Sequence, residues 1–396
     1  MNILFLPNDL EKQQISIIQK YLRSEFALIR MTETMLNKSI IDASFEIREI
    51  LKSANIVEYN QLPKGIENKM MKKALILHEQ NIEENDVSYY RPKTKKGDPR
   101  FWIYNLKRLT TANELIYFTI LEDNLFAIPL IYDINQLERI LQNNFVLDDK
   151  EEIILQELIT RVKQITNDGW VQSIRPHDKP APKDAGETLE FLLGIKPNNS
   201  GAADYKGLIE LKTKISRTTK NTLFCLVPDW ETSLIKSTAE MVLKYGYDSN
   251  KYQGFKDLYV TVNHRPNNQG LYLDIDDNNF LVLQNHRGDN QKITTTCNWK
   301  YNNLKDALLT KHPSTIWIYA ESKIETNITY FKFNTFELTK NPIFSQFLIL
   351  LQEGEITYDW RARVRKDGSK AKDKGNAFRI SNRSRDLLFQ SKKAII

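Results

Sequence analysis

Two carboxylates and an amine stand close together in the stretch "GAADYKGLIELKTKIS", residues 201–216. Asp204 precedes Glu210 by six residues, and Lys212 follows Glu210 by two. Residues two apart on a strand point to the same face, so Glu210 and Lys212 would lie side by side. Converging carboxylates suit a hard divalent cation such as Mg²⁺, and an adjacent ammonium can orient a water or offset charge on a phosphate. Alternating charge on a half-exposed strand gives the same spacing, and spacing alone favours that plain structural interpretation.

A third acid and the scarcity of softer ligands bear on the same chemistry. Glu190, in the preceding segment "GETLEFLLGI", could supply a further oxygen ligand or hold a metal-bound water. The five histidines are scattered, and Cys225 and Cys297 have no metal-type neighbours in the sequence. Two cysteines also argue against a disulfide framework and indicate a reducing compartment. Any metal site in this chain is therefore expected to be built from oxygen ligands.

The pattern of apolar residues predicts two domains. Residues 9–24 and 38–53 have helical periodicity, and residues 100–132 alternate as β-structure does. A break near Asp148-Asp149 precedes an amphipathic helix, "KEEIILQELITRVKQI". We therefore predict an N-terminal domain of helices plus β-structure over residues 1–150 and a second domain over residues 151–396.

The second domain is predicted to be α+β, with a mixed sheet flanked by helices. "GETLEFLLGI" is expected to be a helix, and "GLIELKTKI" and "TLFCLVP" two strands that the turn "SRTTKN" joins as a hairpin. The helix "NPIFSQFLILLQEG" is expected to end at Gly354. Five further strands are predicted, at "DLYVTV", "LYLDID", "FLVLQ", "TIWIYAES" and "TYFKFN".

Charge is distributed unevenly along the 396 residues. The net charge of the chain is +6, yet residues 356–396 hold twelve basic residues against four acidic ones. Apolar residues interleave this basic segment, which a solvated tail would rarely carry. We therefore predict a folded basic strand-loop-strand that faces a polyanion. The interleaving residues are Trp360, Val364, Phe378 and Ile380.

A second basic stretch, "RPKTKKGDPRFWIYNLKR", lies at residues 91–108. It sets basic residues beside Trp102 and Tyr104, a pairing that can serve contact with nucleic acid. The aromatic residues themselves are more simply explained as strand core. For residues 1–150 we expect an accessory DNA-binding or effector domain, with a plain structural extension as the alternative. No apolar run in the sequence approaches the length of a membrane span, so no membrane partner is expected.

Several sequence blocks, taken in order, resemble one family. "GW" before a basic loop, "GETLEFLLGI", "D-YKGLIELKTK" and "TLF" follow the order seen in the MvaI/BcnI restriction endonucleases and the related mismatch-repair nickase MutH. "IYAESKIE", "YFKFN", "EGEITYDWRARV" and "KGNAFRI" look closer to MvaI than to MutH. The resemblance covers about residues 165–382. It implies a PD-(D/E)xK-type nuclease fold that hydrolyses DNA with Mg²⁺ in the cytoplasm of a prokaryote.

The resemblance also assigns the catalytic residues. Asp204 and Glu210 match the metal-binding carboxylates, and Lys212 matches the catalytic lysine. Glu190 matches the helix glutamate that completes the site, whereas Glu187 is a poorer match because it precedes the shared T-x-E. The leading "PD" of the motif is "AD" here, with Ala203 in place of a proline that makes no contact with metal.

The same family acts as monomers on short double-stranded sites of the CC(W or S)GG type. Asp359, Arg361 and Arg379 match the residues that read bases in the major groove. The chemistry agrees, since arginine contacts guanine O6 and N7 and aspartate accepts from cytosine N4. The plain alternative is an exposed cross-strand ion pair. Lys374-Gly375 stands where the family often has "HG". We assign to DNA phosphates Arg363, Arg365, Lys370, Lys372 and Lys374.

Two functions from different classes follow. The first is an Mg²⁺-dependent, sequence-specific double-stranded DNA endonuclease, a type II restriction enzyme. The alternative is a DNA-binding or nicking protein of the MutH type, or a modification-directed one, that needs a partner, a second site or a modified base. The presence of all four expected catalytic residues favours the enzyme.

Overall fold

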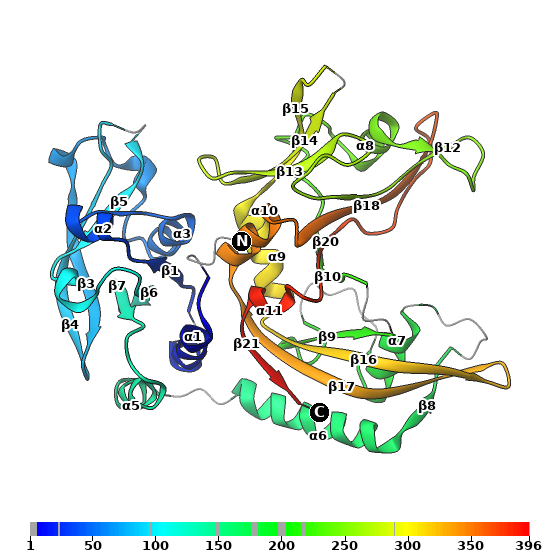
Figure 1. Ribbon diagram of the computed structural model, residues 1–396, viewed down its shortest axis with the longest axis horizontal. Helices are drawn as coiled ribbons and strands as arrows, with labels where there is room; N and C mark the ends of the chain where they lie inside the picture. The colour runs from blue at the N-terminus through cyan, green and yellow to red at the C-terminus, as the bar shows by residue number, and fades with distance from the viewer. Residues whose placement is uncertain are drawn as a thin grey trace. The chain divides into compact units, whose positions relative to one another are not determined.

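The chain divides into two compact units, Met1–Asp148 and Asp149–Ile396. The computed structural model describes residues 6–22, 24–94, 97–146, 150–175, 181, 183–196, 203–215, 219–288 and 290–395 (Figure 1). Within these residues no helix is long and apolar enough to cross a membrane.

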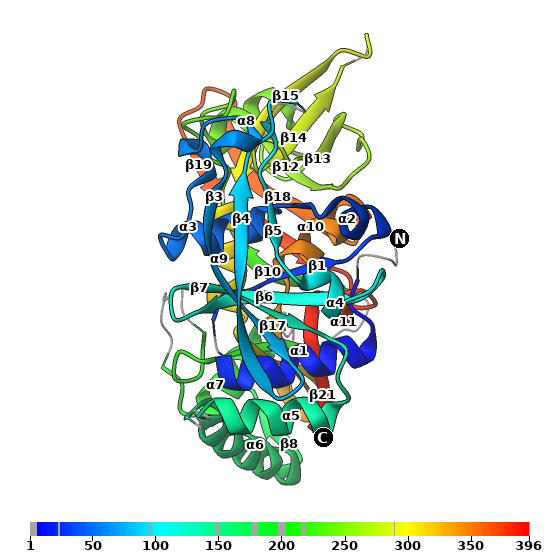
Figure 2. The same cartoon turned by 90° about the vertical axis from the view of Figure 1, so that its left-hand side faces the viewer.

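The N-terminal unit is built on one seven-stranded sheet with helices on both faces (Figure 2). Alternate residues of one strand serve the two faces: Tyr117 packs with helices α1 and α5, and Phe118 packs with α3. This period of two is what a sheet buried on both sides requires. The strands, in sheet order, are β1 (Ala27–Arg30), β6 (Leu115–Leu121), β7 (Asn124–Pro129), β3 (Met70–His78), β4 (Asn81–Tyr90), β5 (Arg100–Ile103) and β2 (Ile41–Asp42). The helices are α1 (Asp9–Leu22), α2 (Glu33–Lys38), α3 (Phe45–Ser53), α4 (Leu106–Leu109) and α5 (Ile134–Asn144), with 3₁₀ turns at Tyr59–Gln61 and Ile66–Asn68.

The helix predicted over residues 38–53 is wrong at its start. Ser39 adopts a left-handed backbone with φ of 52°, which ends α2. The next residues form β2, which pairs with β5, and α3 begins only at Phe45 after its N-cap Ser44. Sheet pairing therefore overrides the helical periodicity of residues 40–44.

The second unit holds three sheets, and the first of them carries the acidic motif. Its order is β21-β17-β16-β9, with β8 paired to β17. β9 runs parallel to β16, and the remaining pairs are antiparallel, so the sheet is mixed. Helices α6 and α7 pack against it through a shared apolar cluster. The elements are α6 (Lys150–Asp168), β8 (Trp170–Gln172), α7 (Asp184–Leu192), β9 (Ile209–Lys214), β16 (Ser314–Glu325), β17 (Ile328–Pro342) and β21 (Phe389–Ala394).

The other two sheets gather the basic C-terminal segment and the central part of the chain. One has the order β10-β20-β18-β12-β11, with β19 paired to β18, and the other has the order β13-β14-β15. Their strands are β10 (Asn221–Cys225), β11 (Tyr247–Asp248), β12 (Phe255–Val262), β13 (Leu271–Asp276), β14 (Leu281–Arg287), β15 (Ile293–Lys300), β18 (Ile356–Arg365), β19 (Ala371–Asp373) and β20 (Ala377–Ile380). The accompanying helices are α8 (Thr238–Tyr245), α9 (Tyr301–Lys311), α10 (Phe344–Gln352) and α11 (Arg385–Leu388).

Two expectations for this unit meet different outcomes. The hairpin predicted between "GLIELKTKI" and "TLFCLVP" is wrong, because β9 pairs with β16 whereas β10 pairs with β20 in another sheet. The basic strand-loop-strand is confirmed as β18, β19 and β20. Its four interleaving apolar residues are fully buried, which explains why so basic a segment folds.

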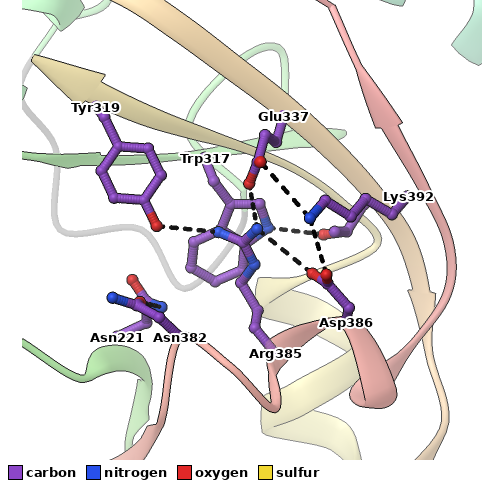
Figure 3. A network of polar contacts seen from close by, with 9 residues as sticks. Asn221, Trp317, Tyr319, Glu337, Asn382, Arg385, Asp386 and Lys392 are labelled. Atoms are coloured by element: carbon purple, nitrogen blue, oxygen red, sulfur yellow. Dashed lines mark hydrogen bonds and ion pairs between the residues drawn. The ribbon is translucent and has the colours of Figure 1, made fainter. Parts of the chain in front are cut away.

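A buried arginine ties the C-terminal strand to the first sheet. Arg385 is 3% exposed, and its guanidinium lies 4.9 Å from the centre of the Trp317 ring. It pairs with Glu337 of β17, and Lys392 of β21 lies 3.5 Å from the same carboxylate (Figure 3). The paired charges hold β21 along β17 at the edge of this sheet.

Candidate active site

Strand β9 presents its acidic and basic residues on one face. Ile209 and Leu211 enter the apolar cluster beneath α6 and α7, so Glu210 and Lys212 project from the opposite face. The parallel register sets Glu210 beside Thr315 of β16. Glu210 has no solvent exposure, and its Oε1 accepts a hydrogen bond from the Lys212 ammonium. The expected side-by-side placement of these two residues is what the structure contains.

Asp204 reaches the same place through a tight turn rather than a strand. Lys206 and Gly207 both have left-handed backbones, with φ of 51° and 74°, and Tyr205 bridges back to Ile209. The reversal brings Asp204 alongside β9, where its Oδ2 accepts a hydrogen bond from Leu211 N at 3.0 Å. The glycine accommodates a conformation that side chains rarely adopt. The turn therefore brings two residues six apart in sequence to one point.

Lys311 is a further member of this group, and the sequence interpretation missed it. Its Nζ lies 3.0 Å from Glu210 Oε2 and 3.7 Å from Asp204 Oδ1, so one ammonium faces both carboxylates. Lys311 is the last residue of α9, the helix that leads into β16, and β16 is the strand that pairs with β9. A basic residue at a helix end was visible in the sequence, but its partner across the sheet was not.

Burial and mutual repulsion shape the charges of these acids. Burial raises the pKa of Glu210, Asp204 raises it further, and Lys212 and Lys311 oppose the rise. Burial also raises the pKa of Glu190 on α7, and Asp204, Glu187 and Glu210 add to that effect. Glu190 thus lies within the electrostatic reach of the other two acids. Among the described residues, no three His, Cys, Asp or Glu side chains form a ready metal cluster.

The surroundings of Glu187 differ from those of Glu190. It pairs with Arg175 and with Lys183, the latter at 3.1 Å, and these partners lower its pKa although burial acts against them. The Glu187 carboxylate therefore forms ion pairs with two cations. The placement agrees with Glu190, rather than Glu187, as the helix glutamate that accompanies the motif.

His312, next to Lys311, is fully buried and bonded at both ring nitrogens. Its Nδ1 lies 2.8 Å from Thr315 Oγ1, and its Nε2 lies 2.8 Å from the carbonyl oxygen of Leu223. A carbonyl can only accept, so Nε2 carries the proton and Nδ1 accepts from the hydroxyl. Burial lowers the pKa of His312 to about 3, with Lys212 and Lys311 adding to the effect. The ring is therefore neutral, and its bond to Thr315 fixes the start of β16 beside Glu210.

The predicted base-reading residues share one face of the second sheet. Arg361 and Asp359 are two apart on β18, and the antiparallel register with β20 and β12 sets Arg379 opposite Thr357 and Thr261 opposite Asp359. Asp359 is 8% exposed, with Oδ1 accepting from Thr261 Oγ1 at 2.9 Å and Oδ2 from Arg379 Nη1 at 2.7 Å. Asp359 therefore pairs with Arg379 on the neighbouring strand, not with Arg361.

Arg361 is the exposed member of this face. Within the described residues its guanidinium makes no ion pair, while its backbone N–H donates to Asn376 Oδ1 at 2.7 Å. Asn376 in turn donates to Asp373 Oδ2 at 2.8 Å, so the turn at Lys374-Gly375 is braced against β18. The backbone that carries Arg361 is thus fixed, and its side chain faces solvent.

The five residues assigned to DNA phosphates differ in their surroundings. Arg363 is engaged, since its Nε donates to Asp257 Oδ1 at 2.6 Å and its guanidinium lies 3.7 Å from the Tyr252 ring centre. Arg365 lies 3.4 Å from Asp367, and the Lys374 ammonium lies 6.0 Å from the Tyr259 ring centre. Lys370 and Lys372 are exposed and make no ion pair with a described residue. The structure thus groups all five near β18 and β19 without testing their contact with DNA.

Comparison with known families decides the identity of this unit. Residues 159–389 match the MvaI/BcnI restriction endonuclease family, and this range contains every site residue named above. The chain belongs to the MvaI/BcnI restriction endonuclease family. It is accordingly a type II site-specific DNA endonuclease, and it binds DNA. The family membership expected from the sequence is confirmed.

One solved structure agrees on the fold. The structure described as restriction endonuclease MvaI in complex with its cognate DNA substrate superposes with a TM-score of 0.54 at 23% identity, covering 63% of this chain and all of that one. MvaI in the absence of DNA has a TM-score of 0.40 at 22% identity, covering 61% and 98% of the two chains. A comparison with curated protein sequences finds no significant match.

Proposed function

We propose that this endonuclease cleaves double-stranded DNA at a short CC(W/S)GG-like site with a PD-(D/E)xK-type centre that uses Mg²⁺. The observation that carries the proposal is the convergence of Asp204 and Glu210 on one cation, the Lys311 ammonium, with Lys212 on the other oxygen of Glu210. Two oxygens that face a common positive charge form the arrangement that a divalent cation needs. We assign catalysis to Glu190, Asp204, Glu210 and Lys212.

The residues fit Mg²⁺ in chemistry as well as in position. Asp204 and Glu210 would hold the ion through carboxylate oxygens, and Glu190 would accept a hydrogen bond from one of its waters. When bound, the ion would supply charge stabilisation at the phosphate and acidify a water. The oxygen-rich set, without a thiol or imidazole among these residues, is the set that a hard cation prefers.

Lys212 is proposed to act on both the attacking water and the phosphate. Its ammonium is fixed by Glu210, and from there an N–H donor could orient a water that attacks phosphorus. The same positive charge would offset the negative charge that develops on the phosphate during hydrolysis. Burial of Glu210 strengthens both effects, because the local dielectric is low.

Sequence reading is proposed for the β18 and β20 face. Arg361 has an exposed guanidinium on a braced backbone, as a bidentate contact to guanine requires. Arg379 is oriented by Asp359, whose two oxygens accept from Thr261 and Arg379 and each retain a lone pair that could accept from a cytosine N4 donor. Arg363, Arg365, Lys370, Lys372 and Lys374 are proposed to contact phosphates, with Arg363 doing so only on exchange of its Asp257 contact.

The remaining proposals concern assembly and the N-terminal unit. We propose that the chain acts as a monomer in the cytoplasm of a prokaryote, with Asp149–Ile396 as the endonuclease domain. The N-terminal unit is proposed to be an accessory domain that contacts DNA or an effector. Its basic stretch begins at the end of β4, where Arg91 Nε donates to the carbonyl of Gly97 at 2.9 Å.

The test is digestion of unmethylated phage DNA by the purified full chain, with and without Mg²⁺, beside Glu210→Gln. Discrete Mg²⁺-dependent fragments that the variant does not produce are expected, and mapping of their ends gives the site. Intact DNA in every lane, together with retarded migration in a gel-shift assay, would contradict cleavage by the chain alone. Equal yields of these fragments in the presence of EDTA would contradict the requirement for Mg²⁺.

A further inference from the structure

Two lysines lie between the catalytic acids and the base-reading face. Lys214 ends β9 on the same face as Glu210 and Lys212, and its parallel partner on β16 is Tyr319. Lys220 immediately precedes β10, and its Nζ donates to Thr357 Oγ1 of β18 at 3.2 Å. The carbonyl of Lys220 accepts from Arg379 Nη2 at 2.8 Å. The two lysines therefore join the first sheet of this unit to the second.

Neither lysine has an acidic partner among the described residues. Lys214 donates to the carbonyl oxygen of Thr219, and Lys220 donates to a hydroxyl, so the direct contacts of both ammonium groups among the described residues are with uncharged oxygens. Both side chains are half-buried. Lys340, another half-buried lysine of this unit, instead lies 3.0 Å from Glu151 Oε1. A partly buried charge without a counter-charge costs stability, so its retention points to a ligand.

The charges around the two lysines are mixed, because the nearby arginines are themselves paired with acids. Burial lowers the pKa of Lys214 to about 8, and the fields of Arg379 and Arg385 add to the effect. Arg385 lies close by, since its Nη1 is 3.5 Å from the hydroxyl of Tyr319 (Figure 3). Burial also lowers the pKa of Lys220, and Asp359 and Glu355 oppose this while Arg379 and Arg383 reinforce it. Arg379, Arg383 and Arg385 already form ion pairs with carboxylates, whereas the two lysines form none with a described residue.

We propose that Lys214 and Lys220 form a binding site for the backbone phosphates of the DNA strand that runs from the cleaved bond to the bases read by Arg361. The inference rests on the proposed function and extends it to two residues outside the family motif. The phosphate supplies an anion in direct contact with each ammonium, which the described residues do not, and its contact fixes the distance between the catalytic centre and the reading face. Lys214 and Lys220 are positioning residues, since they act on the phosphates next to the reacting one.

The first experiment uses the opposite effects expected on stability and on binding. Lys214→Met and Lys220→Met remove an uncompensated charge and keep the apolar stem, so each is expected to raise the melting temperature of the DNA-free protein. Each is also expected to weaken binding to a specific duplex in metal-free buffer by about three- to tenfold and to reduce the slope of log K against log salt by about 1. Lys340→Met is the control: it loses an ion pair, so it lowers the melting temperature and leaves DNA binding unchanged.

The second experiment locates the phosphates. Duplexes that carry the mapped site receive one neutral methylphosphonate at a time, and binding is measured with the wild-type chain and with Lys214→Gln and Lys220→Gln. The wild type should lose affinity at one or two positions between the cut and the first read base, and each variant should be insensitive at its own position. Equal sensitivity of wild type and variants at every position would overturn the phosphate assignment, whatever the melting temperatures show.

Failure of this inference is distinguishable from failure of the proposed function. A wild-type chain that produces no discrete Mg²⁺-dependent fragments would contradict the function itself. A wild type that cleaves at mapped sites, beside lysine variants that bind and cleave as it does, would contradict only the phosphate site. Lower melting temperatures in both lysine variants would also contradict it, because that result assigns the lysines to the fold.

Discussion

Two groups of charged residues at and near β9 differ in how their charges are compensated. One is the cluster around Glu210, and the other consists of Lys214 and Lys220. Around Glu210 the charges alternate, with Lys212 on one oxygen and Lys311 on the other, and Asp204 beyond Lys311. At Lys214 and Lys220 the hydrogen-bond acceptors among the described residues are a carbonyl and a hydroxyl oxygen, and Asp359 and Glu355 act on Lys220 without an ion pair. The first arrangement is stable before any ligand arrives, whereas the second becomes stable when an anion is bound. The endonuclease unit thus combines a charge-compensated cluster with two lysines that we propose to be prepared for substrate.

The base-reading face repeats the contrast on a smaller scale. Asp359 and Arg379 compensate each other and are partly buried, whereas Arg361 two residues away is exposed. A buried pair fixes the shape of the face, and an exposed arginine keeps its donors available for bases. Compensation of charge therefore separates residues that organise the site from residues that we propose to contact the DNA.

The largest effect on cleavage is expected from a change in the charge-compensated cluster around Glu210. Lys212→Ala removes the ammonium that is held at Glu210, so the cleavage rate at saturating enzyme is expected to fall by about 10²–10³-fold. Specific DNA binding should be almost unchanged, because the residue is assigned to the chemical step. Single-turnover cleavage and a gel-shift assay measure the two quantities. A cleavage rate within a factor of three of the wild type would remove Lys212 from the catalytic group.

Lys311→Met tests the same compensation by stability. Glu210 is fully buried and would lose one of its two cations, so unfolding free energy without metal should fall by about 3 kcal/mol. The sign is opposite to that expected for Lys214→Met, although both changes remove a lysine charge from this region. Urea unfolding of both variants measures the comparison. Addition of Mg²⁺ should restore more stability to Lys311→Met than to the wild type, because the ion replaces the missing charge.

The outcome for Lys311 shows where prediction from sequence succeeds and where it stops. The placement of Glu210 beside Lys212 follows from a period of two within one strand, which is local information. Lys311 is about a hundred residues farther along the chain and meets Glu210 only because β16 pairs with β9 in parallel. The same distinction explains the hairpin error, since β9 and β10 were correctly predicted as strands but pair with distant partners. Local pattern predicts elements, and pairing across sheets is set by the whole fold.

The arrangement of the proposed base-reading residues was predicted in part for the same reason. The two-residue spacing of Asp359 and Arg361 placed them on one face of a strand. The pairing of β18 with β20 brings Arg379 into contact with Asp359, and the two-residue spacing alone does not predict this ion pair. Burial of Asp359 likewise depends on the neighbouring strands rather than on its own segment.

The contrast within the reading face gives the next prediction in size. Arg361→Ala should relax discrimination at one base pair by about 1–3 kcal/mol and leave stability unchanged, because its side chain is exposed. Asp359→Asn should lower stability as well, because it weakens a partly buried ion pair with Arg379. Cleavage of a panel of single-base site variants, together with thermal unfolding, measures both. Equal stability losses in the two variants would erase the distinction between organising and reading residues.

The smallest expected effect is a displacement of the pH profile. Because burial raises the pKa of Glu210, its proton binds more tightly in the folded chain than in the unfolded one. The stability that this proton contributes is therefore full below the ordinary pKa of about 4.5 and is lost as pH rises through the raised value. Cleavage has the opposite dependence, since the carboxylate must be ionised to hold Mg²⁺, so activity should rise over the same interval.

Single-turnover rates across this pH range, at two Mg²⁺ concentrations, measure the displacement. The acid limb should have its midpoint above about 4.5 and should move to lower pH at the higher Mg²⁺ concentration, because the ion competes with the proton for the carboxylate. His312 cannot produce this limb, since burial holds its pKa at about 3. A midpoint that does not respond to Mg²⁺ would mean that the titrating group is not a metal ligand. The compensated part of the β9 face would then be a structural ion-pair network, and only its cationic end would remain assigned to DNA.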